Sequence, residues 1–184
     1  HVVPETIDAY IAKHDKPYIV GEVGYEWDWS KNFDDFADGM EMDFRRAFWY
    51  GLFSQTSVTP MTWWWEWFDE HKAIPYMKNA RLISDMMLKS GKGEFKKFDT
   101  TRDGKAEAYS VRCGNRTYVY VYNGNKDVLD QISVEIGKAG KVKVSVLDTE
   151  NVKLGKAVTM KSDGTLNFEG LGLNKWEEKI FVIK

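Results

Sequence analysis

The spacing of apolar residues changes near Gly91–Gly93, and no other feature of the sequence constrains the fold as strongly. Before this point apolar residues recur every three or four positions, in stretches separated by short β-branched runs. After it they alternate with polar residues. A helical period followed by a strand period predicts two regions of different architecture. We place these regions at residues 1–92 and 93–184.

The first region alternates predicted helices with predicted strands. Helical spacing covers residues 5–15, 35–53 and 74–91, and β-rich runs lie between them at residues 18–21 and 57–65. This order implies parallel strands joined by right-handed crossovers, hence an α/β layer or barrel. Two parallel strands cannot bury both faces of a sheet, and a full barrel needs eight strands and about 250 residues. We therefore expect further barrel segments, outside these 184 residues, to complete the first region.

The second region is predicted to be all β. Period-two runs mark seven short strands, at residues 108–113, 117–122, 132–136, 141–147, 157–161, 165–168 and 179–183. Turn residues separate them, among them Gly114–Arg116, Lys138–Gly140 and Asp163–Gly164. This pattern favours a small antiparallel β-sandwich. A row of alternating tyrosines, residues 118, 120 and 122, is either an exposed sugar platform or, as we favour, part of the core.

Composition excludes several classes of function. The chain has 184 residues, 43% of them apolar, and a net charge of -2, which is typical of a soluble globular protein and argues against a nucleic-acid partner. No run approaches the roughly 20 apolar residues that a membrane helix requires, so no membrane partner is expected. The single cysteine, Cys113, is predicted to be a buried structural thiol. The three histidines are scattered and do not have the spacing of a zinc site. We predict neither metal nor cofactor.

Tryptophan and charge are unevenly distributed. Seven of the eight tryptophans fall in the first 67 residues. Residues 1–92 carry a net charge of -5 and residues 93–184 a net charge of +3. This asymmetry supports two regions with different roles.

Glu22 is the best catalytic candidate. It follows the run Tyr18–Gly21, at the carboxyl end of a predicted strand, where parallel barrels carry their active sites. The flanking Gly21 and Gly24 let the backbone bend and leave space beside the carboxylate. The alternative is an exposed acid in an ordinary turn.

Three consecutive tryptophans end the second predicted strand. A flat indole buries the apolar C–H face of a sugar ring while its N–H still donates a hydrogen bond. Strand alternation would place Trp63 and Trp65 on one face and Trp64 on the other, and we predict that Trp65, nearest the strand end, lines the site. The alternative is that all three fill the core.

Further sugar contacts are predicted in the loops that follow the two strands. Trp27 and Trp29 lie in an acidic, aromatic loop after Glu22, and Glu66 follows the second strand. Acids accept hydrogen bonds from hydroxyl groups and aromatic rings provide platforms. A buried lid, or a solvated acid at Glu66, is the alternative.

These motifs resemble those of one enzyme group. The stretch Pro17–Gly24 resembles the seventh-strand motif of clan A glycoside hydrolases, the family 5 cellulases and their relatives. The stretches Phe48–Ser54 and Thr59–Trp65 resemble the seventh helix and eighth strand of family 5-like bacterial enzymes, which often end in a small β-sandwich. The resemblance implies that residues 1–92 form the last two strand–helix units of a (β/α)8 TIM barrel and that residues 93–184 form an accessory sandwich.

The resemblance also implies a function. Glu22 would be the nucleophile of a retaining glycosidase that hydrolyses a β-linked poly- or oligosaccharide, with the acid/base on a fourth strand outside this chain. The missing N-terminal part of the barrel would be an obligatory partner, so the isolated chain is expected to be inactive. Secretion by a bacterium, to the periplasm or the exterior, is expected. The alternative is a non-catalytic carbohydrate-binding or adhesion protein with a degenerate barrel.

Overall fold

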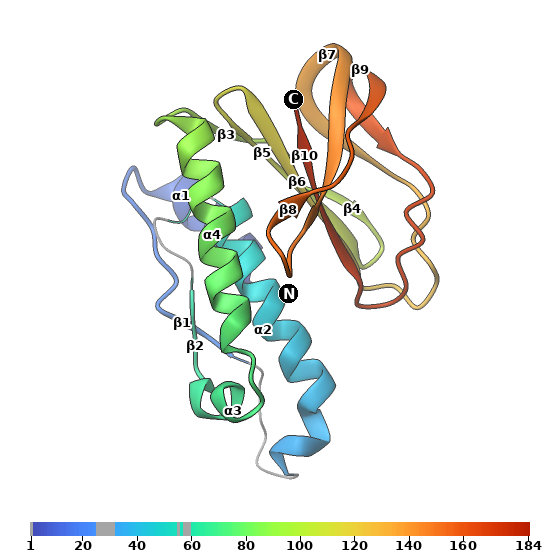
Figure 1. The fold of residues 1–184 in the computed structure, drawn as a ribbon. Coiled ribbons are helices and arrows are strands. Elements are labelled where there is room, and N and C mark those ends of the chain that lie inside the picture. The colour runs from blue at the N-terminus through green and yellow to red at the C-terminus, as the bar shows by residue number, and fades with distance from the viewer. Residues whose placement is uncertain (1, 25–31, 55, 57–59) are drawn as a thin grey trace. The chain divides into compact units, whose positions relative to one another are not determined.

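A computed structural model describes residues 2–24, 32–54, 56 and 60–184 of the chain (Figure 1). The chain divides into two compact units, His1–Arg81 and Leu82–Lys184. No helix in the described ranges is long and apolar enough to cross a membrane. The division between the units falls inside the helix that spans Ile74–Gly91. That residues 1–92 form a catalytic domain and residues 93–184 an accessory domain stays a prediction.

The first unit contains the predicted helices together with two short strands. Its elements are α1 (Val2–Lys13), β1 (Glu22–Val23), the 3-10 turn η1 (Phe33–Phe36), α2 (Ala37–Phe53), β2 (Met61–Thr62), α3 (Trp65–Glu70) and the start of α4 (Ile74–Gly91). Helix α4 has the limits that the sequence predicts. Helix α3 was not predicted.

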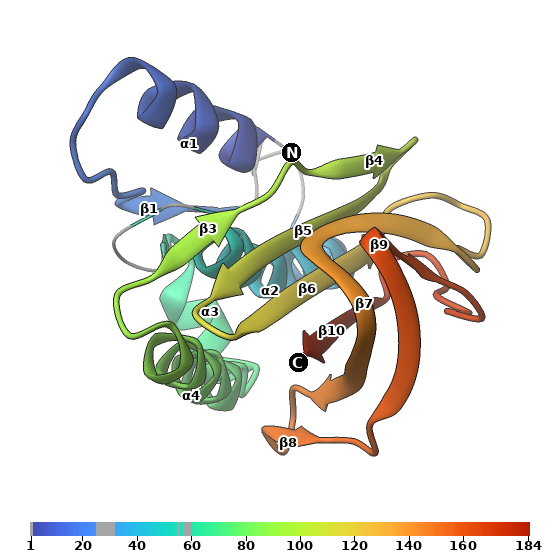
Figure 2. The same ribbon diagram turned by 90° about the horizontal axis from the view of Figure 1, so that it is seen from above.

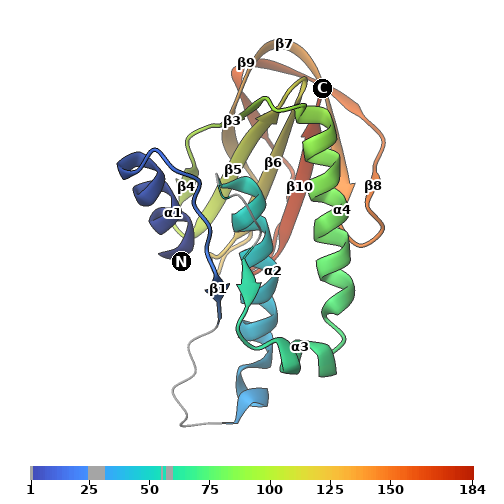
Figure 3. The ribbon, with the colours of Figure 1, turned by 90° about the vertical axis from the view of Figure 1, so that its left-hand side faces the viewer.

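Strands β1 and β2 are parallel, as the alternating order of elements predicts. Glu22 pairs with Met61 and Val23 pairs with Thr62. Upstream of both strands, Tyr18 and Thr56 form an isolated parallel bridge. The strand predicted at residues 18–21 is otherwise absent, and Glu22, predicted to follow that strand, begins β1. Figure 3 shows β1 and β2 side by side, with α2 against them. The described part of the first unit therefore contains a crossover of the kind found in α/β folds.

Helix α2 forms the core of the first unit because apolar residues cover most of its surface. Its fully buried side chains include Trp49, Tyr50 and Phe53, each 0% exposed. Phe44 stacks on Phe68 of α3, with ring centroids 4.2 Å apart. Burial of these large aromatic side chains holds α3 against α2.

The prediction of a strand running to Trp65 was wrong. Strand β2 ends at Thr62, Trp63 and Trp64 form a turn, and Trp65 begins α3. Aromatic residues favour strands, but here tertiary packing prevails: from α3, Phe68 buries its ring against Phe44 and is 2% exposed. Residues 57–59 of the predicted strand lie outside the described residues.

The second unit is one antiparallel sheet. Its strands are β3 (Phe95–Lys97), β4 (Thr101–Asp103), β5 (Ala106–Cys113), β6 (Arg116–Asn123), β7 (Ile132–Asp148), β8 (Lys153–Leu154), β9 (Val158–Phe168) and β10 (Glu178–Ile183). The order is β3-β5-β6-β10-β7-β8, with β4 paired to β5 and β9 paired to β7. The predicted β5–β6 hairpin is confirmed: Cys113 pairs with Arg116 across a two-residue loop.

Two predicted turns are bends inside long strands instead. Lys138–Gly140 lies within β7 and Asp163–Gly164 within β9, and Ala139 pairs directly with Asp163. The register shifts between Glu135 and Ala139, which marks a bulge. The bulge keeps the ladder going while it bends the strand, so four predicted strands merge into two.

Bending lets a single sheet enclose its own core. Figure 2 shows β7 and β9 running together as a bent ribbon. Buried residues of this ribbon, such as Val134 and Leu166, join one hydrophobic cluster with Ala108 and Val121 of the β5–β6 hairpin. One curled sheet thus takes the place of the two separate sheets of the predicted sandwich.

The tyrosine row is buried, as favoured from the sequence. Tyr118 and Tyr120 are 0% exposed and Tyr122 is 2% exposed. The hydroxyl of Tyr118 bonds to the Met86 carbonyl at 3.3 Å and lies 3.0 Å from Ser90 Oγ. These rings belong to the core and do not form an exposed sugar platform.

Candidate active site

Glu22 lies on the face of the strand pair that is turned away from α2. Paired residues of neighbouring strands share a face, so Glu22 and Met61 point one way and Val23 and Thr62 the other. Val23 and Thr62 line a small cavity together with residues of α2, and Thr62 is only 6% exposed. Glu22 is exposed, and Met61 is 55% exposed. In a barrel, the face turned away from the helices is the interior.

Gly24 brings the end of β1 against the tryptophan cluster. The amide of Trp63 donates to the Val23 carbonyl at 2.8 Å, which extends the parallel ladder one residue beyond β2. A Cβ at Gly24 would lie 3.0 Å from Trp63 Cβ and 3.2 Å from Trp64 Nε1. A larger residue at this position would require Trp63 or Trp64 to shift by a few tenths of an ångström. The ladder and the glycine together fix Trp63 beside the residues that follow Glu22.

Trp63 and Trp65 both present their rings to solvent, but from different elements. Trp63 is 55% and Trp65 is 58% exposed. Since the ladder reaches Trp63, strand alternation puts it on the face of Met61 and Glu22. Trp65 begins α3, so the alternation that predicted its position does not apply to it. That Trp65 lines the site stays a prediction.

The remaining predicted sugar contacts are Glu66 and the loop residues Trp27 and Trp29. Glu66 lies in the first turn of α3 and is exposed. Trp27 and Trp29 lie outside the described residues. Their roles as sugar contacts stay predictions.

A cluster that the sequence reasoning missed joins η1 to α3. The ring of His71 stacks on Trp67, with centroids 3.8 Å apart. His71 Nε2 lies 3.7 Å from Asp34 Oδ1, and Trp67 Nε1 donates to the same oxygen at 3.4 Å. The i,i+4 spacing of Trp67 and His71 is the signal, and it was hidden because this stretch was not recognised as a helix. The cluster combines two stacked aromatic rings with a carboxylate.

Asp43 lies on the opposite side of the strand pair from Glu22. It lines the small cavity with Val23 and Thr62. Burial raises the pKa of Asp43, and the nearby Arg46 guanidinium opposes that rise. Because it shares the α2 side, Asp43 is not a partner carboxyl for Glu22. Within the described residues, no three His, Cys, Asp or Glu side chains gather closely enough to hold a metal ion.

The comparisons with known proteins rest on structure alone. No protein-family model matches the sequence, and no curated protein matches it either. Among solved structures, one described as a glycoside hydrolase matches 98% of this chain and 45% of its own, with a TM-score of 0.67 and 14% identity. A glycoside hydrolase family 5 structure from Bacteroides vulgatus matches 78% of this chain and 36% of its own, with a TM-score of 0.56 and 12% identity.

The chain spans less than half the length of either of these structures. At such low identity the similarity establishes the fold and not the chemistry. The fold of this chain is therefore one that it shares with part of the structures of glycoside hydrolases.

Proposed function

We propose that this chain is part of a glycosidase that hydrolyses a β-linked poly- or oligosaccharide with retention of configuration, and that Glu22 is its nucleophile. The observation that carries the proposal is the position of Glu22. It is exposed on the face of a parallel strand pair turned away from the packing helix, and Trp63 follows on the same face. The fold shared with glycoside hydrolases supports this assignment.

The chemistry requires two carboxyl groups about 5–5.5 Å apart. A carboxylate oxygen of Glu22 would attack the anomeric carbon, and the glycosidic C–O bond would break as a second carboxyl gives its proton to the leaving oxygen. Water would then attack the glycosyl ester, returning a proton to the second group and freeing Glu22. The proposal gives Glu22 the nucleophilic step only.

The second carboxyl belongs, in this proposal, to barrel strands outside these 184 residues. Only one pair of parallel strands is present among the described residues, and a barrel needs eight. We infer that an N-terminal part of the barrel would be the partner that completes the site. We expect the purified chain alone to show no turnover, and measurable hydrolysis by it would contradict the proposal.

Substrate binding is assigned to the aromatic residues around the strand ends. Trp65 and Trp63 would stack on sugar rings, with Trp27, Trp29 and Glu66 as additional contacts. Exposed indoles suit this role because they bury the apolar face of a pyranose and retain a donor for its hydroxyl groups. A polysaccharide substrate also fits a protein secreted by a bacterium.

The test is Glu22→Gln in the full-length protein, assayed on β-1,4-linked glucan, xylan and mannan oligosaccharides. Loss of the nucleophile should lower kcat by about 10³-fold or more. Glu169→Gln, at an exposed acid that follows β9 in the second unit, is the matched control and should retain activity. A 2-deoxy-2-fluoro glycoside should trap the ester, and peptide mass spectrometry should find the sugar on Glu22.

Two results would reject the proposal. Wild-type turnover by Glu22→Gln would exclude a nucleophilic role. Tight oligosaccharide binding by the wild-type full-length protein without turnover on any of the oligosaccharides would favour a non-catalytic carbohydrate-binding or adhesion protein.

A further inference from the structure

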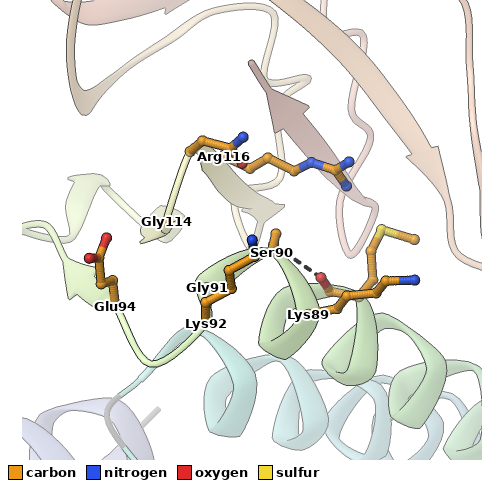
Figure 4. Close-up of a pocket in the computed structure, with 9 residues that line it drawn as sticks. Lys89, Ser90, Gly91, Lys92, Glu94, Gly114 and Arg116 are labelled. Carbon is orange, nitrogen blue, oxygen red and sulfur yellow. Dashed lines mark hydrogen bonds between the residues drawn. The ribbon is translucent and has the colours of Figure 1, made fainter.

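A second pocket lies wholly within the second unit, remote in sequence from Glu22. It has a volume of about 770 Å³ and lies between the last turn of α4 and the β5–β6 loop (Figure 4). Its lining consists of residues from these two segments and the chain between α4 and β3: Met86, Lys89–Lys92, Glu94 and Gly114–Arg116. The proposed hydrolysis makes no use of this pocket.

Backbone contacts build the walls of the pocket. Gly114 has a φ of 58°, and a Cβ there would lie 2.3 Å from the Ser90 carbonyl oxygen. Its amide donates to the Glu94 carbonyl at 2.9 Å, and the Glu94 amide donates to the Gly91 carbonyl at 2.8 Å. The hairpin loop and the helix end are thus fixed against each other, so the pocket has a defined shape.

Three cations line this pocket with a single acid. Lys89, Lys92 and Arg116 have no carboxylate partner within the part of the chain that the structure describes, and Glu94 has no cationic partner there. The carboxyl end of α4 adds roughly half a negative charge. Three positive charges against this and one glutamate leave the pocket positive.

Several carbonyls near the end of α4 accept from groups other than the lysine side chains. The Met86 and Met87 carbonyls accept from Ser90 Oγ, each at 3.0 Å, the first of them drawn as the dashed line in Figure 4. The Leu88 carbonyl accepts from the Lys92 amide at 3.1 Å. With the Gly91 carbonyl, which accepts from the Glu94 amide, four carbonyls near the helix end are served by backbone and hydroxyl donors, so these four do not require the lysine side chains.

We propose that this pocket binds a small oxyanion, either the carboxylate of an acidic sugar or a free phosphate. In Figure 4, Lys89 and Arg116 extend toward the same side of the pocket and Glu94 lies on the other. The planar guanidinium of Arg116 gives a two-pronged donor for a carboxylate or phosphate, and Lys89 adds a point charge. This inference does not depend on the proposed role of Glu22.

The experiment is isothermal titration of the full-length protein at low salt. Three ligands are compared: a galacturonate oligosaccharide, inorganic phosphate and neutral cello-oligosaccharide. The double variant Lys89→Gln/Arg116→Gln should weaken anion binding about tenfold or more, because it removes two charge-assisted contacts. Lys161→Gln, an exposed lysine of β9 in the same unit, is the control and should leave the affinity unchanged.

Glu94→Gln provides a test with the opposite sign. Removing the only acid of the lining should tighten anion binding by about threefold. Galacturonate binding without phosphate binding would identify a site for acidic sugars, and binding of phosphate alone would identify a phosphate site. Absence of binding by either anion, or equal weakening by Lys161→Gln, would overturn the proposal.

Discussion

Gly24 lies so close to Trp63 that a Cβ at position 24 would be 3.0 Å from the Cβ of Trp63. Strand β1 and the tryptophan turn therefore approach each other with no side chain between them. A substitution at position 24 tests this contact directly. Gly24→Ala must push Trp63 or Trp64 aside, so we expect it to destabilise the first unit by about 1–3 kcal/mol and to weaken sugar binding.

Gly21→Ala is the control, because nothing lies within 4 Å of a Cβ there. Thermal unfolding and oligosaccharide titration of the two variants in the full-length protein provide the comparison. Equal effects at both glycines would show that the approach to Trp63 does not matter.

Trp63→Ala should weaken substrate binding while leaving the fold intact. The side chain is 55% exposed, so its loss removes little core packing. Loss of one stacked ring should cost about 0.5–1.5 kcal/mol of binding, which corresponds to a rise in KM of about 2- to 13-fold. Trp176→Ala, at an exposed tryptophan of the second unit, should leave KM unchanged; a similar rise in KM there would argue against a specific platform at Trp63.

Gly114→Ala and Gly172→Ala separate strain from steric conflict in the second unit. Both glycines have positive φ, 58° and 56°, but only Gly114 has a backbone oxygen 2.3 Å from the position of a Cβ, that of Ser90. We expect Gly172→Ala to cost about 1 kcal/mol and Gly114→Ala at least about 2 kcal/mol more. Thermal midpoints of the second unit measure both, and equal losses would exclude the predicted clash.

The thiol of Cys113 should be inert in the folded protein. Burial raises the pKa of Cys113 to about 12. Between roughly pH 8.5 and pH 12 the unfolded chain loses this proton while the folded chain keeps it, so stability falls as pH rises through that window. Cys113→Ala should show a flatter decline of the unfolding midpoint over the same window.

Alkylation at pH 8.5 gives a second readout for the same residue. Iodoacetamide should label the unfolded chain much faster than the native one, because the reactive thiolate forms only where water reaches the sulfur. Rapid labelling under native conditions would contradict the burial of Cys113.

Local sequence signals predicted elements that rely on local interactions. Helix α4 was predicted with its limits, since its apolar period is regular and Pro75 and Gly91 mark its ends. The β5–β6 hairpin was predicted from the turn Gly114–Arg116; its loop is one residue shorter than predicted, because Arg116 already pairs with Cys113. The parallel pairing of β1 with β2 followed from the order of elements and not from any single residue.

Features set by distant contacts were not predicted. The run Trp63–Trp65 has strand propensity, but the chain is helical from Trp65, and in this helix Phe68 stacks on the distant Phe44. Gly140 of β7 and Gly164 of β9 predict turns when each segment is considered alone. Because the two strands pair with each other through this region, the chain bends there and the strands continue. The face on which Glu22 lies, turned away from α2, likewise follows from the pairing register of β1 with β2, in which Glu22 is opposite Met61.

The pairing of Glu22 with Met61 also bears on the order in which the protein folds. It joins residues about forty positions apart, whereas Cys113 and Arg116 close a loop of two residues. Hairpins form within about 1–10 μs, whereas parallel pairing is slower because closing a long loop has a large entropic cost. We therefore expect the β5–β6 hairpin to form before β1 finds its partner. Positioning of the proposed nucleophile would then be a late event. During refolding of the full-length protein, the compact dimensions of the chain should return before its activity does.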